Sequence, residues 1–113
     1  MKIAISAGGN GWDERYDERF GRAWGFFVYD TKTQETTYID NRDNVEAAHG
    51  AGTSSARAVV DAGVEAVITG RVGPNAEAVL RAAGIRIITR SGCPTVQGAF
   101  DSWKQAGTGE QTS

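Results

Sequence analysis

The chain has 113 residues, with 12 Lys and Arg against 14 Asp and Glu, a formal net charge of −2 and a single Cys. This length fits one domain with a sizeable core, and one Cys cannot form an internal disulfide, so a disulfide-stapled secreted scaffold is excluded. The acidic balance argues against a general nucleic-acid binder, because such proteins need a basic surface. The apolar runs fall far short of the ~20 residues that span a bilayer, and the start has no signal-peptide pattern. We therefore expect a cytoplasmic protein with no nucleic-acid or membrane partner.

The first half of the chain predicts a strand, a charged loop and a β-hairpin. Residues 2–6 form an apolar run that is typical of a buried strand, and a glycine-rich turn follows it. Residues 13–19 are mostly charged, which predicts a solvated loop. Residues 24–30 and 35–40 are rich in aromatic and β-branched side chains and flank a short polar connection, which predicts a hairpin.

The middle of the chain predicts an irregular segment, a helix and a buried strand. Residues 41–52 show no regular pattern, and Thr53 or Ser54 then stands where a helix N-cap is expected. Gly63 follows the last apolar position of this helix and predicts its end. Residues 64–69 are mostly apolar, with Glu65 as the one charged residue, which indicates a strand covered on both faces.

The last part repeats this pattern. Pro74 stands near the start of a second helix, where its missing N–H costs little, and Gly84 predicts the end of that helix. The apolar stripe of the second helix comprises Ala76, Val79, Leu80 and Ala83. Residues 85–89 form another strand, and Thr95 caps a third helix that ends at Gly107. The stripe of the third helix comprises Val96, Ala99, Phe100 and Trp103.

The order of these elements predicts the fold class. A unit of helix, glycine stop and buried strand occurs twice in succession, which implies parallel strands joined by right-handed crossovers. With the first strand they form a parallel core, and the hairpin extends one edge. We therefore predict an α/β fold with a five-stranded mixed sheet and three helices. We expect a single domain over residues 1–107 and a flexible tail over residues 108–113.

Glycine-rich loops follow the predicted parallel strands at Ser6–Trp12, Gly70–Pro74 and Arg90–Pro94. Ligands of open α/β sheets bind beyond the carboxyl ends of the strands, where bare backbone and helix starts favour anions. Arginines near these loops, among them Arg90, make the predicted cleft locally cationic. The candidate ligand-contacting residues are Asn10, Gly11, Arg19, Arg22, His49, Gly50, Gly52, Gly70, Arg71, Gly73 and Asn75.

Two residues are candidates for direct metal coordination, the single His49 and the single Cys93. The alternative for His49 is a capping or surface role, and the alternative for Cys93 is an inert thiol. A thiolate at Cys93 would be stabilised by the helix start that follows it. The aromatic residues Trp12, Tyr16 and Trp24 either cover a ligand or pack in the core.

Common enzyme and metal motifs are absent from the sequence. It contains no phosphate-binding loop, no dinucleotide-binding turn and no Cys or His pattern with metal-ligand spacing. The core-strand segments Lys2–Ser6, Val67–Thr69 and Arg86–Thr89 carry no Asp or Glu, which disfavours a Mg²⁺-dependent nuclease. A metal bound here would have to bring its own ligands, such as sulfide, and be held as an anion.

Four segments of the sequence have a familiar pattern: Met1–Ile5, Arg19–Ala23, Gly50–Gly52 and Val67–Ala76. Together they resemble the dinitrogenase iron–molybdenum cofactor biosynthesis family, which includes NifX-like proteins, the C-terminal domain of NifB and the orange-protein group. The resemblance covers residues 1–106. The orange-protein branch is the most similar one, because of the sequences Arg19-Phe20-Gly21-Arg22 and Ala48-His49-Gly50-Ala51-Gly52.

The resemblance implies a ribonuclease H-like fold and a non-catalytic protein that carries a molybdenum-containing metal–sulfur cluster. The orange-protein group is associated with a molybdenum–copper sulfide, and the family implies protein partners in cluster delivery or regulation. Many members have His at the position of Arg19, so we expect this arginine to pair with an anionic cluster rather than ligate a metal. Two alternatives stay open: an interaction or regulatory module for a protein partner or small organic anion, and, less favoured, a ribonuclease H-like enzyme.

Overall fold

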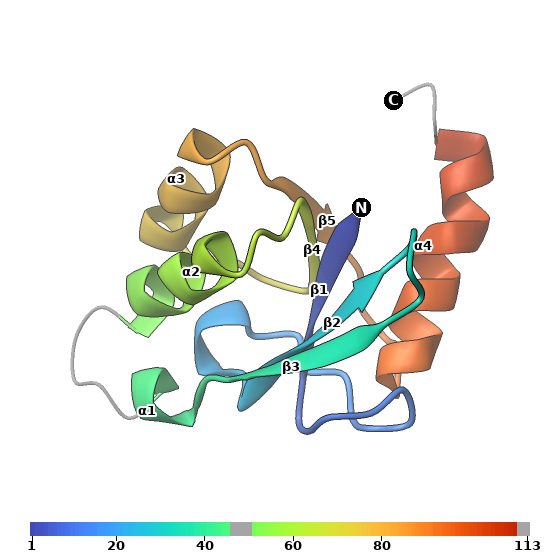
Figure 1. Cartoon of the computed structure of the whole chain (residues 1–113), viewed down its shortest axis with the longest axis horizontal. Coiled ribbons are helices and arrows are strands. Elements are labelled where there is room, and N and C mark those ends of the chain that lie inside the picture. Colours follow the sequence, from blue (N-terminus) through green and yellow to red (C-terminus); the bar gives the residue numbers. More distant parts are fainter. Residues whose placement is uncertain (46–50, 111–113) are drawn as a thin grey trace.

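The chain folds into a five-stranded sheet with helices on both faces (Figure 1). The computed structural model describes the backbone of residues 1–45 and 51–110, and the side chains of residues 1–43 and 53–105. The strands are β1 (Lys2–Ala7), β2 (Gly25–Asp30), β3 (Thr36–Asp40), β4 (Ala66–Thr69) and β5 (Arg86–Thr89). The helical segments are the 3-10 turn η1 (Phe20–Arg22), α1 (Arg42–Val45), α2 (Ala51–Asp61), α3 (Pro74–Ala82) and α4 (Val96–Glu110).

The sheet has the strand order β3-β2-β1-β4-β5. β1 runs parallel to β4, and β4 runs parallel to β5, whereas β2 is antiparallel to both β1 and β3. The predicted parallel core and the hairpin at one edge are therefore confirmed. The three predicted helices correspond to α2, α3 and α4, and the ribonuclease H-like label stays a prediction.

β1 lies at the centre of the sheet and buries both of its faces. Ile3 and Ile5 belong to an apolar cluster that includes Phe100 of α4, whereas Ala4 belongs to a second cluster that includes Val59 of α2. A strand that is covered on both faces consists almost entirely of apolar residues, which explains why β1 could be predicted from the sequence. The two clusters place α2 and α3 on one face of the sheet and α4 on the other (Figure 1).

Gly63 and Gly84 follow α2 and α3 in the left-handed backbone region, both with a φ of +77°. In each case the glycine N–H donates back to the helix, to Val60 O and Arg81 O at 3.0 Å. Only glycine adopts this conformation without strain, so both predicted helix ends are confirmed with their physical cause.

Replacing Gly63 by Ala is expected to lower the free energy of unfolding by about 1–2 kcal/mol, the cost of a side chain at positive φ. Apart from its chain neighbours, a Cβ added at Gly63 meets no atom of another described residue within 4 Å, so the variant tests backbone strain. Urea unfolding measures the loss. Gly98→Ala inside α4 is the control, and we expect it to be neutral or to stabilise by up to about 1 kcal/mol. Equal losses in both variants would contradict the assignment.

The segment between β3 and α2 differs from the sequence prediction. A one-turn helix, α1, occupies part of the stretch that was expected to be irregular, and α2 begins at Ala51, ahead of the expected caps Thr53 and Ser54. The start of α1 is stabilised locally, because Asp40 Oδ1 accepts the backbone N–H of Arg42 at 3.0 Å. Such a short side-chain bond to the backbone leaves little signal in an apolar pattern.

The ends of α3 and α4 also differ. Ala83 is the exposed C-cap of α3, so it does not extend the apolar stripe. α4 runs to Glu110, and the predicted end at Gly107 is wrong. A glycine stops a helix where it takes a positive φ, whereas the backbone of α4 continues through Gly107 as a helix. Residues 111–113 of the predicted flexible tail lie outside the described residues. None of the described helices combines the length and apolar character needed to cross a membrane.

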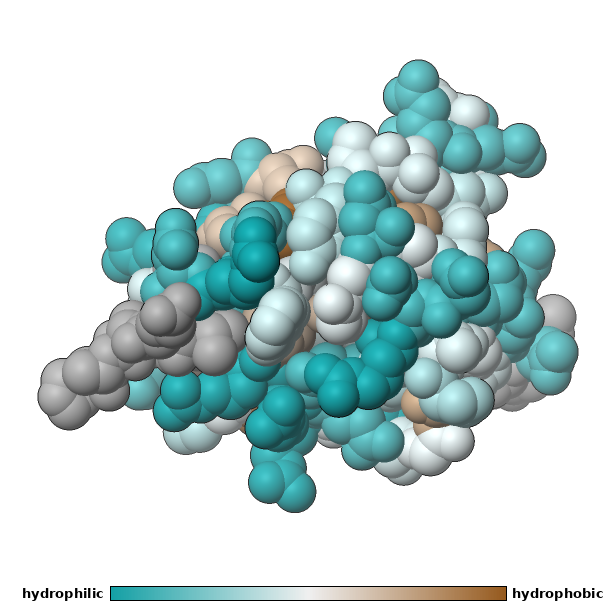
Figure 2. All heavy atoms as spheres, turned by 90° about the horizontal axis from the view of Figure 1, so that it is seen from below, coloured by the Kyte–Doolittle hydropathy of each residue, from teal (hydrophilic) through white to brown (hydrophobic). Residues whose placement is uncertain are grey.

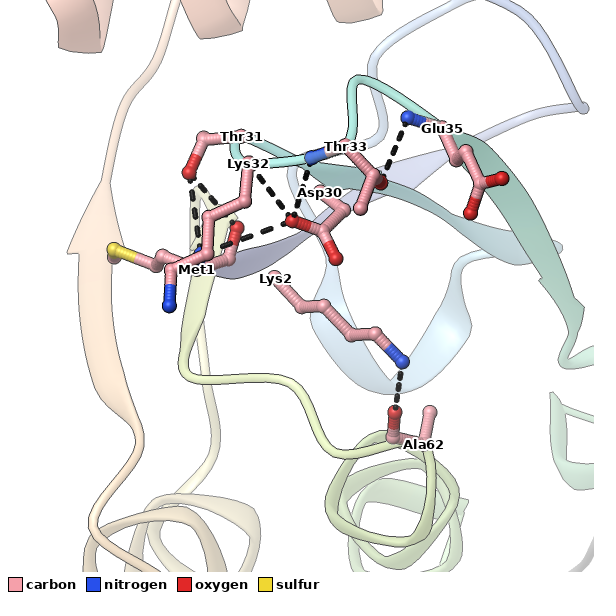
Figure 3. A network of polar contacts seen from close by, with 8 residues as sticks. All are labelled: Met1, Lys2, Asp30, Thr31, Lys32, Thr33, Glu35 and Ala62. Atoms are coloured by element: carbon pink, nitrogen blue, oxygen red, sulfur yellow. Dashed lines mark hydrogen bonds and ion pairs between the residues drawn. The ribbon is translucent and has the colours of Figure 1, made fainter.

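The N-terminus and the turn of the hairpin are tied together (Figure 3). The Met1 ammonium lies 3.8 Å from Asp30 Oδ1 and donates to Thr31 Oγ1 at 3.2 Å. The Asp30 carboxylate accepts the backbone N–H of Lys32 at 2.9 Å, and this bond holds the pKa of Asp30 below its ordinary value. The amino end of β1 is thus fixed to the β2–β3 turn, and the predicted ligand-binding loops lie at the other end of the strand.

Candidate functional site

Two hydroxyl side chains join β1 and β4 near their carboxyl ends. Ser6 Oγ and Thr69 Oγ1 lie 2.8 Å apart, and both residues are fully buried. Ser6 Oγ also donates to the carbonyl oxygen of Asp17 at 2.5 Å, while the Asp17 N–H donates to Ser6 O at 3.0 Å. The segment expected to be a solvated loop is therefore docked on the sheet, with Tyr16 and Asp17 buried. Because their neighbours in the sequence are charged, the composition of this segment does not indicate that the side chains of Tyr16 and Asp17 are buried.

The docked segment pairs with the loop that follows β4. The Arg71 N–H donates to Glu18 O at 2.6 Å, and the Phe20 N–H donates to Arg71 O at 3.1 Å. These two bonds form a parallel bridge in which Arg19 and Arg71 are partners. Side chains of bridge partners lie on the same side of the paired backbones. The bridge therefore sets two arginines next to each other, which we call the arginine pair.

Gly70 makes this pairing possible. A Cβ at Gly70 would lie 2.5 Å from Glu18 Cβ and 2.8 Å from Glu18 O, closer than real side chains come. The bare α-carbon is thus used by the neighbouring segment of the chain. The sequence predicted that Gly70 contacts a ligand, and the structure gives it a packing role that is sufficient to require glycine.

The arginine pair is exposed and unevenly neutralised. Arg19 Nε lies 3.4 Å from Asp17 Oδ1, with the Arg19 side chain 65% exposed and the Asp17 side chain 4% exposed. Arg71 is exposed, and among the described residues no carboxylate pairs with it. Two guanidinium charges on neighbouring residues repel each other, and an anion placed between them would relieve that repulsion.

The start of α3 is open next to the arginine pair. α3 begins after Gly73 with Pro74 in its first turn and without a side-chain cap. Apart from its chain neighbours, no described residue has an atom within 4 Å of the position that a Cβ on Gly73 would take. The first-turn N–H groups of a helix, such as that of Asn75, and the helix dipole both favour an anion at such a start.

The start of α4 is closed. The N–H groups of Val96 and Gln97 donate to Glu14 O at 2.9 Å and to Trp12 O at 2.7 Å. The next N–H, that of Gly98, donates to Thr95 Oγ1 at 3.0 Å, which confirms Thr95 as the N-cap. The loop after β1 therefore caps α4 with its own carbonyl groups, so this helix start has no free donors for an anion.

The predicted site residues consequently fall into separate groups. Arg19, Arg22, Gly70, Arg71, Gly73 and Asn75 lie on η1, the bridge and the start of α3. Asn10, Gly11 and Cys93 lie on the two loops that lead to the capped start of α4. Gly52 belongs to the first turn of α2, which packs against η1. His49 and Gly50 lie outside the described residues.

Cys93 sits in an apolar environment. It packs against the cluster that contains Ile88 and Phe100, and its Sγ lies 3.8 Å from Ser91 O. No group of three or more His, Cys, Asp or Glu among the described residues is arranged to hold a metal ion. A bare metal ion therefore does not suit the described site, whereas an anion with its own ligands suits the arginine pair and the start of α3.

The three aromatic residues near the loops have different surroundings. Trp12 packs edge-on against Phe27 and Phe100 with ring centroids 4.8 and 5.2 Å away, which is a core position. Tyr16 is buried and donates its hydroxyl to Arg90 O at 2.8 Å; burial raises its pKa, so it stays neutral. Trp24 is 52% exposed, at the same end of the sheet as the site, and is the one of the three that is free to meet a ligand or partner.

Trp24 rests on a fixed ion pair. The Arg42 guanidinium lies 5.9 Å from the Trp24 ring centroid and bonds to both carboxylate oxygens of Asp40, at 3.1 and 2.7 Å. These bonds lower the pKa of Asp40 from 3.8 to about 2. Hydrophilic side chains dominate this end of the molecule, which Figure 2 shows from below.

This ion pair predicts an acid-dependent loss of stability. A lowered carboxyl pKa in the folded state contributes stability that is present above the unfolded pKa near 3.8 and is lost as the pH falls through about 2. We therefore expect the parent chain to be more stable than Asp40→Asn at pH 6, and the difference to vanish between pH 4 and pH 2. Urea unfolding of both proteins across this range measures it; a difference that does not change with pH would contradict the assignment.

Comparison with known proteins finds similarity over nearly the whole chain. The sequence model of a family described as dinitrogenase iron-molybdenum cofactor matches residues 1–106. An uncharacterized protein of Methanocaldococcus jannaschii is 33% identical over 92 residues, which is 77% of this chain and 72% of that protein. The apo form of the orange protein from Desulfovibrio gigas has a TM-score of 0.85 and 39% identity, over 93% of this chain and 88% of that one. A NifB-like protein from Thermotoga has a TM-score of 0.81 and 34% identity, over 92% and 87% of the two chains. The matched region includes the arginine pair and the start of α3.

Proposed function

The chain belongs to the dinitrogenase iron–molybdenum cofactor family, and on this premise we propose that it binds and carries an anionic metal–sulfur cluster. The observation that carries this proposal is the arginine pair beside the open start of α3. A cluster whose metals are already surrounded by sulfide needs positive charge and N–H donors rather than protein ligands. The described part of the chain offers positive charge and N–H donors, and it contains no group of three or more His, Cys, Asp or Glu that could hold a metal ion.

The proposed role is that of a carrier rather than an enzyme. The parallel strands β1, β4 and β5 contain no Asp or Glu, so they lack the carboxylates with which a metal-dependent nuclease holds its ions. Tyr16, which is buried close to the site, keeps its proton because burial raises its pKa. The proposal also includes a cytoplasmic location and protein partners that deliver or receive the cluster.

The proposed cluster site consists of central residues and of residues with weaker structural support. Its centre is the arginine pair with Arg22, Gly73 and Asn75. His49 and Gly50, which precede α2 in the chain, and Gly52, which belongs to its first turn, remain in the proposal because α2 packs against η1. The loops that carry Asn10, Gly11 and Cys93 face the capped start of α4, which supports only a peripheral role for these three residues.

The cluster is proposed to contain molybdenum, in keeping with the description of the family. A molybdenum–copper sulfide is the more specific proposal, and it rests on the resemblance to the orange-protein group. The test uses tetrathiomolybdate with and without Cu⁺ under anaerobic conditions. After gel filtration we expect molybdenum and a visible sulfide-to-metal absorption band to elute with the protein. Loss of all metal from the protein would refute the carrier function, and equal retention with and without copper would refute the copper-containing composition.

Cys93→Ala is expected to retain the cluster as well as the parent chain does. The thiol lies in an apolar cluster beside α4, apart from the arginine pair, and a cluster with a complete sulfide shell does not need it. The measurement is molybdenum content per protein after gel filtration. A Cys93→Ala protein that elutes without molybdenum would show that the protein ligates the cluster directly.

A second function is favoured by one observation, the half-exposed Trp24 above the Asp40–Arg42 ion pair. Exposed, rigidly supported tryptophans are frequent anchors of protein interfaces. An interaction or regulatory module would use this residue for a protein partner without holding any metal. The same gel filtration separates the two functions, because such a module elutes free of molybdenum.

A further inference from the structure

Asp17 is the buried carboxylate of the site, and its bonds do not satisfy it. Its side chain is 4% exposed, and its Oδ2 accepts no hydrogen bond from the described residues. A buried carboxylate with an unpaired oxygen lowers the stability of a fold rather than raising it. Buried polar groups without a hydrogen-bond partner are found most often at functional positions of a protein.

The other oxygen of Asp17 serves Arg19. Asp17 Oδ1 accepts the backbone N–H of Arg19 at 2.9 Å and lies 3.4 Å from Arg19 Nε. One oxygen thus contacts both the main chain and the guanidinium of the same residue. A long, exposed arginine side chain loses much rotamer freedom when it is ordered, so a fixed acceptor at Nε lowers the entropy cost of using its terminal N–H groups.

Asp17 is itself fixed to the sheet. Its N–H donates to Ser6 O and its carbonyl oxygen accepts the Ser6 hydroxyl, which in turn lies 2.8 Å from Thr69 Oγ1. This connection runs from β4 through β1 to Asp17 and from there to Arg19. Arg71 reaches the same place by its backbone bonds to Glu18 and Phe20 and does not depend on the Asp17 carboxylate.

We propose that Asp17 is a positioning residue, whose buried carboxylate holds Arg19 beside Arg71 so that both guanidinium groups bind one anionic cluster. This inference rests on the proposed function. It also assigns two opposing effects to one side chain. Asp17 improves binding by ordering Arg19, and it weakens binding because its negative charge lies close to an anion. The ordering effect needs Arg19, whereas the repulsion does not.

The test is the affinity for tetrathiomolybdate of Asp17→Ala in three backgrounds: the parent chain, Arg19→Ala and Arg71→Ala. We expect Asp17→Ala to weaken binding about tenfold in the parent and in Arg71→Ala, which both keep Arg19. In Arg19→Ala we expect no weakening and a slight gain, because only the repulsion is removed. Asp17→Asn retains an acceptor at Oδ1 and is expected to bind within about threefold of the parent.

Two other outcomes would overturn the inference. Equal weakening in all three backgrounds would mean that Asp17 supports only the fold, and a gain in all three would mean that it only repels the anion. Urea unfolding of each variant identifies proteins that fail to fold. If Asp17→Ala fails to fold, Asp17→Asn replaces it, and affinity like that of the parent chain supports the positioning role. Tenfold weaker binding caused by Asp17→Asn in the Arg19→Ala background refutes that role.

A measurement without any cluster keeps this inference apart from the proposed function. The Nε–H group of Arg19 gives an NMR signal whose exchange with water slows when the group is held by an acceptor. We expect a slowly exchanging signal in the parent chain and in Asp17→Asn, and fast exchange in Asp17→Ala. If the parent binds no tetrathiomolybdate, the proposed function fails, and this signal still shows whether Asp17 orders Arg19. Fast exchange in the parent would overturn the positioning role even if the cluster binds.

Discussion

Replacing Arg19 and Arg71 together by Ala is expected to weaken cluster binding by roughly a hundredfold or more. Each charge-assisted hydrogen bond of a partly desolvated site contributes about 1.5–3 kcal/mol, which corresponds to roughly a ten- to hundredfold change in affinity. The two guanidinium groups share one anion, so we expect the double variant to lose less than the sum of the single losses. Titration with tetrathiomolybdate and the molybdenum retained after gel filtration measure both.

A matched control separates the arginine pair from the net charge. Lys32→Ala with Arg86→Ala removes the same number of positive charges from exposed residues at the amino ends of the strands, on the hairpin turn and at the start of β5. We expect this double variant to bind like the parent at 0.15 M salt, where charges more than about 8 Å away are screened. If both double variants lose affinity equally, the cluster does not bind at the arginine pair.

Gly70→Ala is expected to lower the free energy of unfolding by about 1–3 kcal/mol, because the added Cβ would overlap the backbone of Glu18. The overlap acts on the two bonds that join Glu18 and Phe20 to Arg71, so the bridge must open or shift. We expect cluster affinity to fall at least tenfold together with the stability, since the arginine pair exists only through this bridge. Urea unfolding and tetrathiomolybdate titration of the same protein test the coupled loss.

Gly73→Ala is the control in the same loop. In the described part of the chain, no residue other than its chain neighbours comes within 4 Å of its added Cβ, and its φ of −71° suits any residue. Gly73 is the N-cap of α3, where glycine is preferred over alanine, so we expect a loss of unfolding free energy of about 0.5–1 kcal/mol without any steric overlap. A Gly70→Ala protein that is as stable as Gly73→Ala and keeps its cluster would show that the bridge does not form the site.

The sheet could be predicted because its signals are local. Gly63 and Gly84 end helices at positions where the backbone turns left-handed, and the apolar runs of β1 and β4 are continuous because both of their faces are covered. The edge strand β5 is covered only in part, with Arg86 and Thr89 exposed. Thr95 was found from its place before an apolar helical stripe, and the N–H of Gly98 does bond to its hydroxyl. Each of these features depends on residues within a few positions along the chain.

The geometry of the site depends on contacts between distant residues. The charged stretch that includes Tyr16 and Asp17 looks solvated by composition, yet its backbone pairs with Ser6 and its last residues with Arg71. Backbone hydrogen bonds of this kind leave no residue-type signal, so the sequence placed Arg19 and Arg71 near each other without showing that they are bridge partners. For the same reason it could not show that the loop after β1 caps α4 and stands apart from the arginine pair.

The central place of β1 has a consequence for how the chain is made. β1 leaves the ribosome well before its parallel neighbour β4, which begins at Ala66, and the carbonyl groups of Trp12 and Glu14 receive their donors only when the first turn of α4 at Val96 has been synthesised. Before β4 and α4 are made, the nascent β1–β2–β3 unit exposes the edge of β1 with which β4 later pairs and the apolar face that α4 later covers. Open edges and bare apolar faces are where partly made chains associate with each other or with chaperones. The nascent chain is therefore most prone to such association while the segment from β4 to α4 is being synthesised. This period ends when the first turn of α4 forms its hydrogen bonds with the loop after β1.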